Sequence, residues 1–261
     1  MFNFTTKLQN AISMNKFVFL IICIGFSILS CKNQKTTVLN ANEIINKSID
    51  VSGGETFDAS TIAFNFRDKH YIAKRNNGIF QLVRQYKDSI FNVKDVVSND
   101  GFKRYIEDEL KKVPDSMAVK YAASVNSVHY FSVLPYGLND AAVMKTGLGE
   151  ETIKDQNYYK IQVTFKQEGG GEDFEDVFVY WVNKDTYKVD YLAYSYKETD
   201  GVGFRFREAY NERYVNGLRF VDYNNYNVVT DITSVTELGV LFETNKLKLL
   251  SKIELKNISV N

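Results

Sequence analysis

Runs of alternating apolar and polar residues, joined by short turns, are the feature that most constrains the fold of this 261-residue chain. In residues 61–67, Ile62, Phe64 and Phe66 alternate with smaller or polar side chains, which is the period of a half-buried strand. Further strands are expected at 79–86, 89–97, 159–166, 177–182, 187–196, 204–214, 218–229 and 247–258. Strands joined by short turns pair as antiparallel neighbours, so the sequence predicts a large antiparallel sheet.

Segments with helical spacing interrupt the strands. Residues 40–53 begin with Asn40, followed three residues later by Glu43, which is a capping-box pattern. Residues 115–131 repeat apolar side chains at helical spacing, and a third, short helix is expected at 139–145. Helices beside an antiparallel sheet indicate an α+β fold. Because a large sheet twists and curls, we predict one curled antiparallel β-sheet, a half-barrel, with helices covering its concave face.

The N-terminal segment has the pattern of an export signal. Lys16 precedes an apolar run at residues 17–26 that is short for a membrane-spanning helix and suits a signal-peptide core. The run ends in Leu29-Ser30-Cys31, the order of a bacterial lipobox, in which a small residue precedes the lipidated cysteine. The alternative is an uncleaved anchor with a free cysteine.

These features divide the chain into three parts. We predict a signal peptide over residues 1–30, with Met14 as an alternative start. Cys31 is the predicted lipidation site, to which a diacylglyceryl group and palmitate would be attached. Residues 31–39 would form a tether, and residues 40–261 a single β-rich domain.

The charge and the cysteine and histidine content narrow the function. The 32 basic residues balance the 32 acidic ones, which does not favour nucleic acid as a partner. After Cys31 the chain contains no further cysteine, so its core must stabilise it without a disulfide. His70 and His129 are far apart in the sequence, and we predict neither a metal site nor a cofactor.

One group of candidate ligand-binding residues lies on and after the predicted helix at 115–131. Asn126 and His129 would share a face of that helix and form a polar spot in a cavity between helix and sheet. Alternatively, His129 is satisfied in the core or stabilised by the helix C-terminal dipole. Tyr130 and Asp140 complete this group.

A second group consists of Arg205 and Arg207, which occupy alternate positions of one predicted strand and so share a face. Two arginines so placed could bind an anionic head group or phosphate by bidentate contacts. The alternative is a solvated ladder of cross-strand ion pairs, which contributes little stability.

Several strings of the chain resemble a known family. They are SVNSVHYFSVLPYGLNDAAV at 124–143, QEGGGEDFEDVFVYWVN at 167–183, VDYLAYSY at 189–196 and FRFREAYN at 204–211. These strings resemble lipoproteins of Bacteroidetes-type bacteria that share a domain of unknown function, some of which carry a deoxyribose-phosphate aldolase label. The predicted architecture is also similar to that of LolA/LolB-like lipoprotein carriers, which implies a hydrophobic ligand.

The leading hypothesis is a lipid-anchored cell-envelope protein, not an enzyme, that binds a hydrophobic or amphiphilic ligand between sheet and helices. That ligand would be a lipid or a lipoprotein. Residues 32–35 contain no acidic run, unlike surface-displayed lipoproteins of the group that the chain resembles, so we expect an outer-membrane anchor that faces the periplasm.

Two other hypotheses stay open. One is an envelope enzyme in which His129, Asn126 and Asp140 act as acid and base groups, with an aldolase among the activities considered. The other is a structural subunit of an envelope complex, which would expose a large apolar patch.

Overall fold

The structure is a computed structural model that describes residues 39–172, 174–198, 201–229, 232 and 234–261. Leu39–Asn261 form one compact unit. The predicted signal peptide, the predicted lipidation site Cys31 and residues 31–38 of the predicted tether lie outside the described residues.

The described strands form two seven-stranded antiparallel sheets. In order across the first, sheet A, they are β14 (Lys256–Val260), β1 (Thr61–Phe66), β2 (Lys69–Asn76), β3 (Ile79–Asp88), β4 (Phe91–Ser98), β5 (Gly101–Ile106) and β6 (Glu109–Lys111). Across the second, sheet B, they are β13 (Leu247–Ile253), β12 (Leu218–Val228), β11 (Gly201–Val215), β10 (Val189–Glu198), β9 (Val177–Asn183), β8 (Gln156–Phe165) and β7 (Val143–Ile153). The predicted α+β fold with curled, unclosed antiparallel strands is therefore confirmed, but the prediction of a single sheet is wrong.

The prediction of one continuous last strand at 247–258 is wrong, and its failure explains why there are two sheets. β13 pairs with β12 in sheet B, whereas β14 pairs with β1 in sheet A. The chain turns between them at Leu255, whose backbone N–H donates to Asp222 Oδ1 at 2.9 Å and whose side chain is buried in the core of sheet A. Residues 247–260 thus contribute one strand to each sheet.

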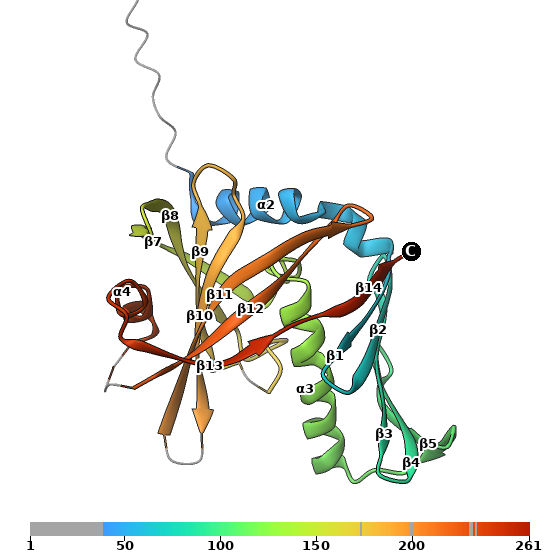
Figure 1. The fold of residues 1–261 in the computed structure, drawn as a ribbon. Coiled ribbons are helices and arrows are strands. Elements are labelled where there is room, and N and C mark those ends of the chain that lie inside the picture. The colour runs from blue at the N-terminus through green and yellow to red at the C-terminus, as the bar shows by residue number, and fades with distance from the viewer. Residues whose placement is uncertain (1–38, 173, 199–200, 230–231, 233) are drawn as a thin grey trace, which may run out of the picture. The chain divides into compact units, whose positions relative to one another are not determined.

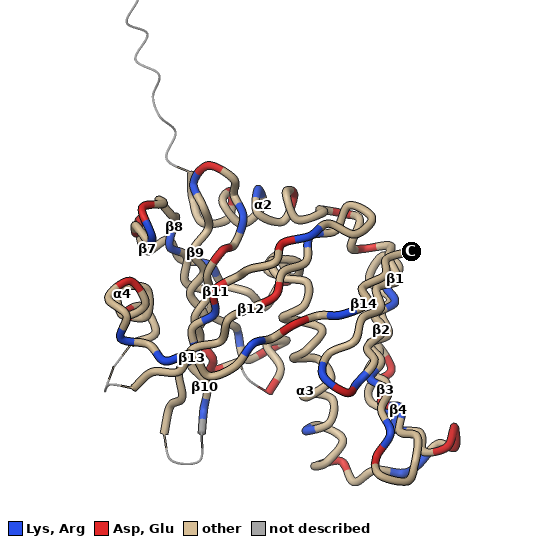
Figure 2. The backbone as a smooth tube through the Cα atoms, in the orientation of Figure 1, with Lys and Arg blue, Asp and Glu red and all other residues tan. Residues whose placement is uncertain are grey.

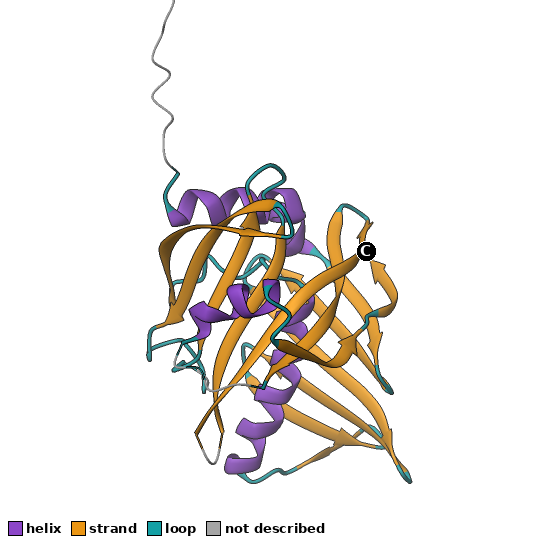
Figure 3. Cartoon of the chain, turned by 60° about the vertical axis from the view of Figure 1, so that its left-hand side comes forward, coloured by secondary structure: helices purple, strands orange, loops and turns teal. Residues whose placement is uncertain are grey.

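The two longest described helices lie against the strands. α2 (Ala41–Ser52) begins at the predicted capping box, in which the Asn40 side chain accepts from the Glu43 N–H at 3.0 Å and the Glu43 carboxylate accepts from the Asn40 N–H at 2.8 Å. α3 (Asp115–Ser132) runs between the two groups of strands (Figures 1 and 3). The 3-10 helix η1 (Gly54–Ala59) connects α2 to β1.

The short helix expected at 139–145 is wrong. Residues 139–142 form turns, and β7 begins at Val143, which pairs with Phe165 of β8. Helix propensity in so short a segment is weak, and pairing with β8 overrides it.

The core has layers on both sides of sheet B. As predicted, β9 is buried on both faces: Phe178 and Tyr180 pack in one cluster, and Val179 and Trp181 in another. The second cluster is closed by α4 (Leu238–Glu243) and the 3-10 helix η2 (Val235–Glu237), which the sequence did not predict because they are too short to show a period. Acidic and basic residues are interspersed along the chain (Figure 2), as the balanced composition suggests.

Candidate functional site

A cavity of about 910 Å³ lies between α3 and strands of both sheets. This volume is near the upper end of the roughly 300–1,000 Å³ that is usual for small-molecule sites. From sheet A the cavity is lined by Phe66, Val97 and Phe102, and Leu255 lines it from the turn between β13 and β14. From sheet B it is lined by Phe165, Phe178, Tyr194, Tyr196, Lys197, Arg207, Val221, Tyr223 and Ile253, and the segment before β9 adds Glu172 and Asp176.

Short side chains on α3 leave the space open. Ala118, Ala122, Ala123 and Ser127 line the cavity, and none of them is long enough to fill the gap to sheet B. The lining runs from Asp115 to the last turn of α3, a length of about 25 Å at 1.5 Å per residue. The helix therefore forms one long wall of the cavity.

Charged groups hold α3 against sheet A on its other side. Asp95 of β4 accepts hydrogen bonds from Arg84 at 2.7 Å and from Arg104 at 2.7 Å. Arg84 also donates to the Ser124 hydroxyl of α3 at 2.7 Å, and the Arg104 guanidinium lies 3.6 Å from the Tyr121 ring centroid. This network fixes the helix without entering the cavity.

His129 points away from the cavity and into the core of sheet A. It is 1% exposed, its Nε2 lies 3.1 Å from the Val83 carbonyl oxygen, and its ring meets Phe64 and Tyr71 edge-on. Because the carbonyl accepts, Nε2 carries the proton. Burial lowers the pKa of His129 to about 4, so the imidazole is neutral.

The structure does not bring His129, Asn126 and Asp140 together. Asn126 lines the cavity, whereas His129 does not, and Asp140 is exposed in the turn before β7. Tyr130 lines the cavity, and its hydroxyl lies 3.2 Å from the hydroxyl of Tyr180. Burial raises the pKa values of both tyrosines, so both hydroxyls are neutral.

Arg207 is a buried cation in the cavity wall. It is 7% exposed, and its guanidinium carbon lies 3.8 Å from the ring centroid of Phe131, 5.1 Å from that of Tyr194 and 5.9 Å from that of Tyr223. Within the described residues its hydrogen bonding consists of one bond, from Nη2 to the Tyr194 hydroxyl at 2.9 Å. Its Nε is buried and has no partner there.

Arg205 differs from Arg207 although it shares the strand face. Its guanidinium donates to the Phe204 carbonyl at 2.8 Å and to Asn227 Oδ1 at 3.0 Å, and it does not line the cavity. The two arginines predicted as a pair are therefore separated, and only Arg207 faces the ligand-sized space.

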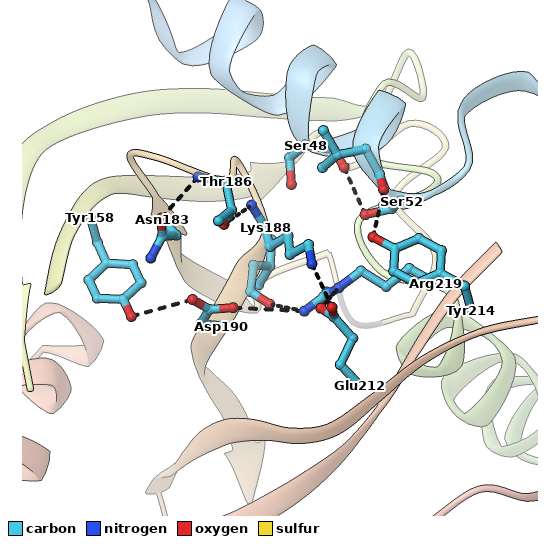
Figure 4. Close-up of polar contacts among 12 residues, drawn as sticks. Ser48, Ser52, Tyr158, Asn183, Thr186, Lys188, Asp190, Glu212, Tyr214 and Arg219 are labelled. Atoms are coloured by element: carbon cyan, nitrogen blue, oxygen red, sulfur yellow. Dashed lines mark hydrogen bonds and ion pairs between the residues drawn. The ribbon is translucent and has the colours of Figure 1, made fainter. Parts of the chain in front are cut away.

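The two other buried arginines in the described part of the chain are each neutralised. Arg84 pairs with Asp95. Arg219 is 3% exposed and lies 2.6 Å from Glu212 and 3.7 Å from Asp190, in a polar cluster below α2 that also contains Lys188 (Figure 4). Arg207 has no such carboxylate among the residues that the structure describes, and this contrast sets its position apart.

Sequence reasoning missed the aromatic residues that surround Arg207. Phe131, Tyr194 and Tyr223 belong to α3, β10 and β12 and are distant in sequence. Tyr194 and Tyr196 are two residues apart on one strand, which was a signal that their rings share a face, but this spacing could not show which cation they contact.

Two further findings concern metals and membranes. Among the described residues no group of His, Cys, Asp and Glu side chains is placed to hold a metal ion. No described helix has both the length and the apolar character that crossing a membrane requires.

The fold and the cavity define an α+β domain with a mostly apolar cavity beside α3. Residues 14–255 match the family of unknown function DUF6503, and the chain belongs to that family. No curated protein matches the chain.

Three solved structures illustrate what the chain is similar to. A LolA superfamily protein from Nitrosomonas europaea has 11% identity and a TM-score of 0.46, over 85% of this chain and 92% of that one. A putative outer membrane lipoprotein-sorting protein domain from Vibrio parahaemolyticus has 9% identity and a TM-score of 0.42, over 71% of this chain and 85% of that one. Lipoprotein LppX of Mycobacterium tuberculosis has 14% identity and a TM-score of 0.27, over 61% of this chain and 88% of that one.

Proposed function

We propose that this protein is a lipid-anchored protein of the cell envelope that binds a hydrophobic or amphiphilic ligand, a lipid or a lipoprotein, in the cavity beside α3. The observation that carries the proposal is the cavity itself: about 910 Å³, elongated along a helix of small residues and faced by aromatic side chains. Closing such a space with a larger side chain would bury more apolar surface, so the small residues on α3 favour a ligand as its occupant.

The shape of the cavity suits a chain-like ligand. Ala118 and Ala122 lie one helical turn apart and, with Val119, form an apolar track on α3, in a cavity that Val97 and Phe102 of sheet A also line. An acyl chain laid along this track would lose its contact with water over most of its length. Burial of each methylene group contributes about 0.8 kcal/mol.

Native mass spectrometry tests the binding part of the proposal. The full chain with Cys31→Ala, isolated without detergent, is incubated with a total lipid extract of bacterial membranes. We expect an added mass that denaturation releases as lipid. Absence of any added mass contradicts the proposal.

Two variants locate that lipid in the cavity. Ala122→Phe places a ring in the cavity, and we expect it to abolish the added mass. Met117→Phe adds a ring to an exposed position of the same helix outside the cavity, and we expect it to retain the lipid. Equal retention by both variants would place the lipid elsewhere.

The anchor is tested separately. In cells fed with labelled palmitate, we expect label on the full chain and none on Cys31→Ala. Fractionation of inner and outer membranes, followed by protease treatment of intact cells, then tests the outer-membrane, periplasm-facing placement. Degradation in intact cells would contradict that placement.

A further inference from the structure

We propose that the ligand carries an anionic group, and that the guanidinium of Arg207 binds this group inside the cavity. This inference rests on the proposed function and narrows it to one chemical class: a hydrocarbon chain that ends in a carboxylate or a phosphate. A ligand of neutral esters and amides alone would not belong to this class.

The first argument is the missing counter-charge. A buried guanidinium without a carboxylate is costly, because it gives up its hydration and gains no Coulombic partner. Arg84 and Arg219 have carboxylate partners at 2.7 Å and 2.6 Å. Arg207 has the same degree of burial as Arg84, at 7% exposure, and no ion pair with any carboxylate of the described residues. An anion that arrives with the ligand would supply the missing charge.

The second argument is the donor inventory. An arginine presents five N–H donors in a planar fork that matches a carboxylate or a phosphate. Arg207 uses one of them, in its bond to the Tyr194 hydroxyl, and its buried Nε has no partner among the described residues. The remaining donors are available to an oxyanion that enters the cavity.

The third argument is the rigid placement of the cation. The rings of Phe131, Tyr194 and Tyr223 hold the guanidinium by cation–π contacts, which partly offset its desolvation and keep it in the wall of the cavity. A side chain fixed in this way loses little conformational freedom when the ligand binds.

The position of Arg207 also orients the ligand. Phe131, which the guanidinium contacts, belongs to the last turn of α3, whereas the track of Ala118, Val119 and Ala122 belongs to its first half. The anionic group would lie at the C-terminal end of the helix, and the hydrocarbon chain would extend towards its N-terminal end.

Displacement of the uncharged fluorophore N-phenylnaphthylamine from the full chain with Cys31→Ala provides the test. The competitors are dodecanoate, dodecyl phosphate and dodecanol, which share one chain and differ in the head group. Acetate and inorganic phosphate serve as anions without a chain. We expect at least one of the two charged amphiphiles to bind about tenfold, or more than tenfold, more tightly than dodecanol does. The two chainless anions should not displace the fluorophore.

Arg207→Met removes the charge and keeps much of the side-chain length. We expect it to bind dodecanol as the unsubstituted chain does and to lose the preference for the charged amphiphiles. Arg205→Met, a change two residues away on the same strand and outside the cavity, should keep that preference. The relative affinities for dodecanoate and dodecyl phosphate distinguish a carboxylate from a phosphate ligand.

The outcomes separate this inference from the proposed function. If no amphiphile displaces the fluorophore, the proposed function fails. If dodecanol binds as tightly as both charged amphiphiles, the cavity is a lipid site and the role of Arg207 is overturned. If Arg207→Met still prefers the charged amphiphiles to dodecanol, the role of Arg207 is overturned as well. Should that variant not fold, the comparison of head groups on the unsubstituted chain still decides the question.

Discussion

The guanidinium carbon of Arg207 lies 3.8 Å from the centroid of the Phe131 ring, so a cation–π contact joins the last turn of α3 to sheet B across one end of the cavity. The other side of the same helix is tied to sheet A through Ser124 and Tyr121. α3 is thus fixed to both sheets, and the cavity beside the helix remains open.

The contact between Phe131 and Arg207 should contribute measurably to stability. We expect Phe131→Leu to lower the free energy of unfolding by about 1 kcal/mol more than Phe165→Leu does, because only Phe131 faces a cation. Both rings line the cavity, and both substitutions remove a ring and keep apolar bulk. Urea denaturation measures the difference, and equal losses in the two variants would show that the cation–π contact contributes nothing.

Substitution of the buried Asp95 in sheet A should lower the free energy of unfolding more than substitution of the exposed Asp108. Asp95 has a fully buried side chain between Arg84 and Arg104, so Asp95→Asn leaves two guanidinium groups without a counter-charge. We expect a loss of about 3–5 kcal/mol in the free energy of unfolding.

The matched control is Asp108→Asn. Asp108 pairs with Lys94, the residue next to Asp95, but its side chain is 91% exposed, and surface pairs of this kind contribute about 0–1 kcal/mol. Urea denaturation compares the two variants. A loss for Asp95→Asn as small as that for Asp108→Asn would contradict the role given to this network.

His129 should make the protein less stable in acid. Burial lowers its pKa in the folded state to about 4, below the ordinary 6.5. Between these pH values the unfolded chain binds a proton that the folded chain does not. The free energy of unfolding therefore falls as the pH drops from 6.5 towards 4, by roughly 3 kcal/mol from this group.

The check is the slope of unfolding free energy against pH. His129→Asn cannot titrate and should show a shallower slope than the unsubstituted chain between pH 4 and pH 6.5. His70→Asn, which removes the other histidine and leaves His129 in place, is the matched control. An unchanged slope in His129→Asn would assign the acid sensitivity to other groups.

Much of the fold could be predicted from local patterns. Alternation within the strands, the Asn40 capping box and the doubly buried run of β9 are all encoded by neighbouring residues, and each was found where the sequence indicated. The bend at Leu255 could not be predicted in this way, since it depends on a hydrogen bond to Asp222 from another strand. Contacts between segments distant in sequence leave no periodic signal.

The candidate site was predictable to a similar extent. The helix at 115–131 and a cavity beside it followed from spacing, and Asn126, Tyr130 and Arg207 do line that cavity. Spacing could not show that His129 points into the core of sheet A, because a helix periodicity gives relative directions and not the neighbour that each face meets. The surroundings of Arg207 required the packing of three separate elements.

The polar cluster below α2 yields the last prediction. Asp190 is partly buried and lies beside Arg219 (Figure 4). Burial raises the pKa of its carboxyl, and the charge of Arg219 is the largest influence that lowers this pKa. Arg219→Met removes that influence and leaves Asp190 and Glu212 without their shared cation. We expect a loss of about 3 kcal/mol in the free energy of unfolding at neutral pH.

The loss in Arg219→Met should depend on pH. Because a raised pKa of Asp190 in the folded state favours the protonated form, part of this loss should be recovered as the pH falls. Urea denaturation at neutral and mildly acidic pH measures both effects. Lys188→Met removes a different partner of Glu212 and a weaker influence on Asp190 than Arg219, so it should show less recovery in acid; an equal recovery would assign the effect to Glu212 instead of Asp190.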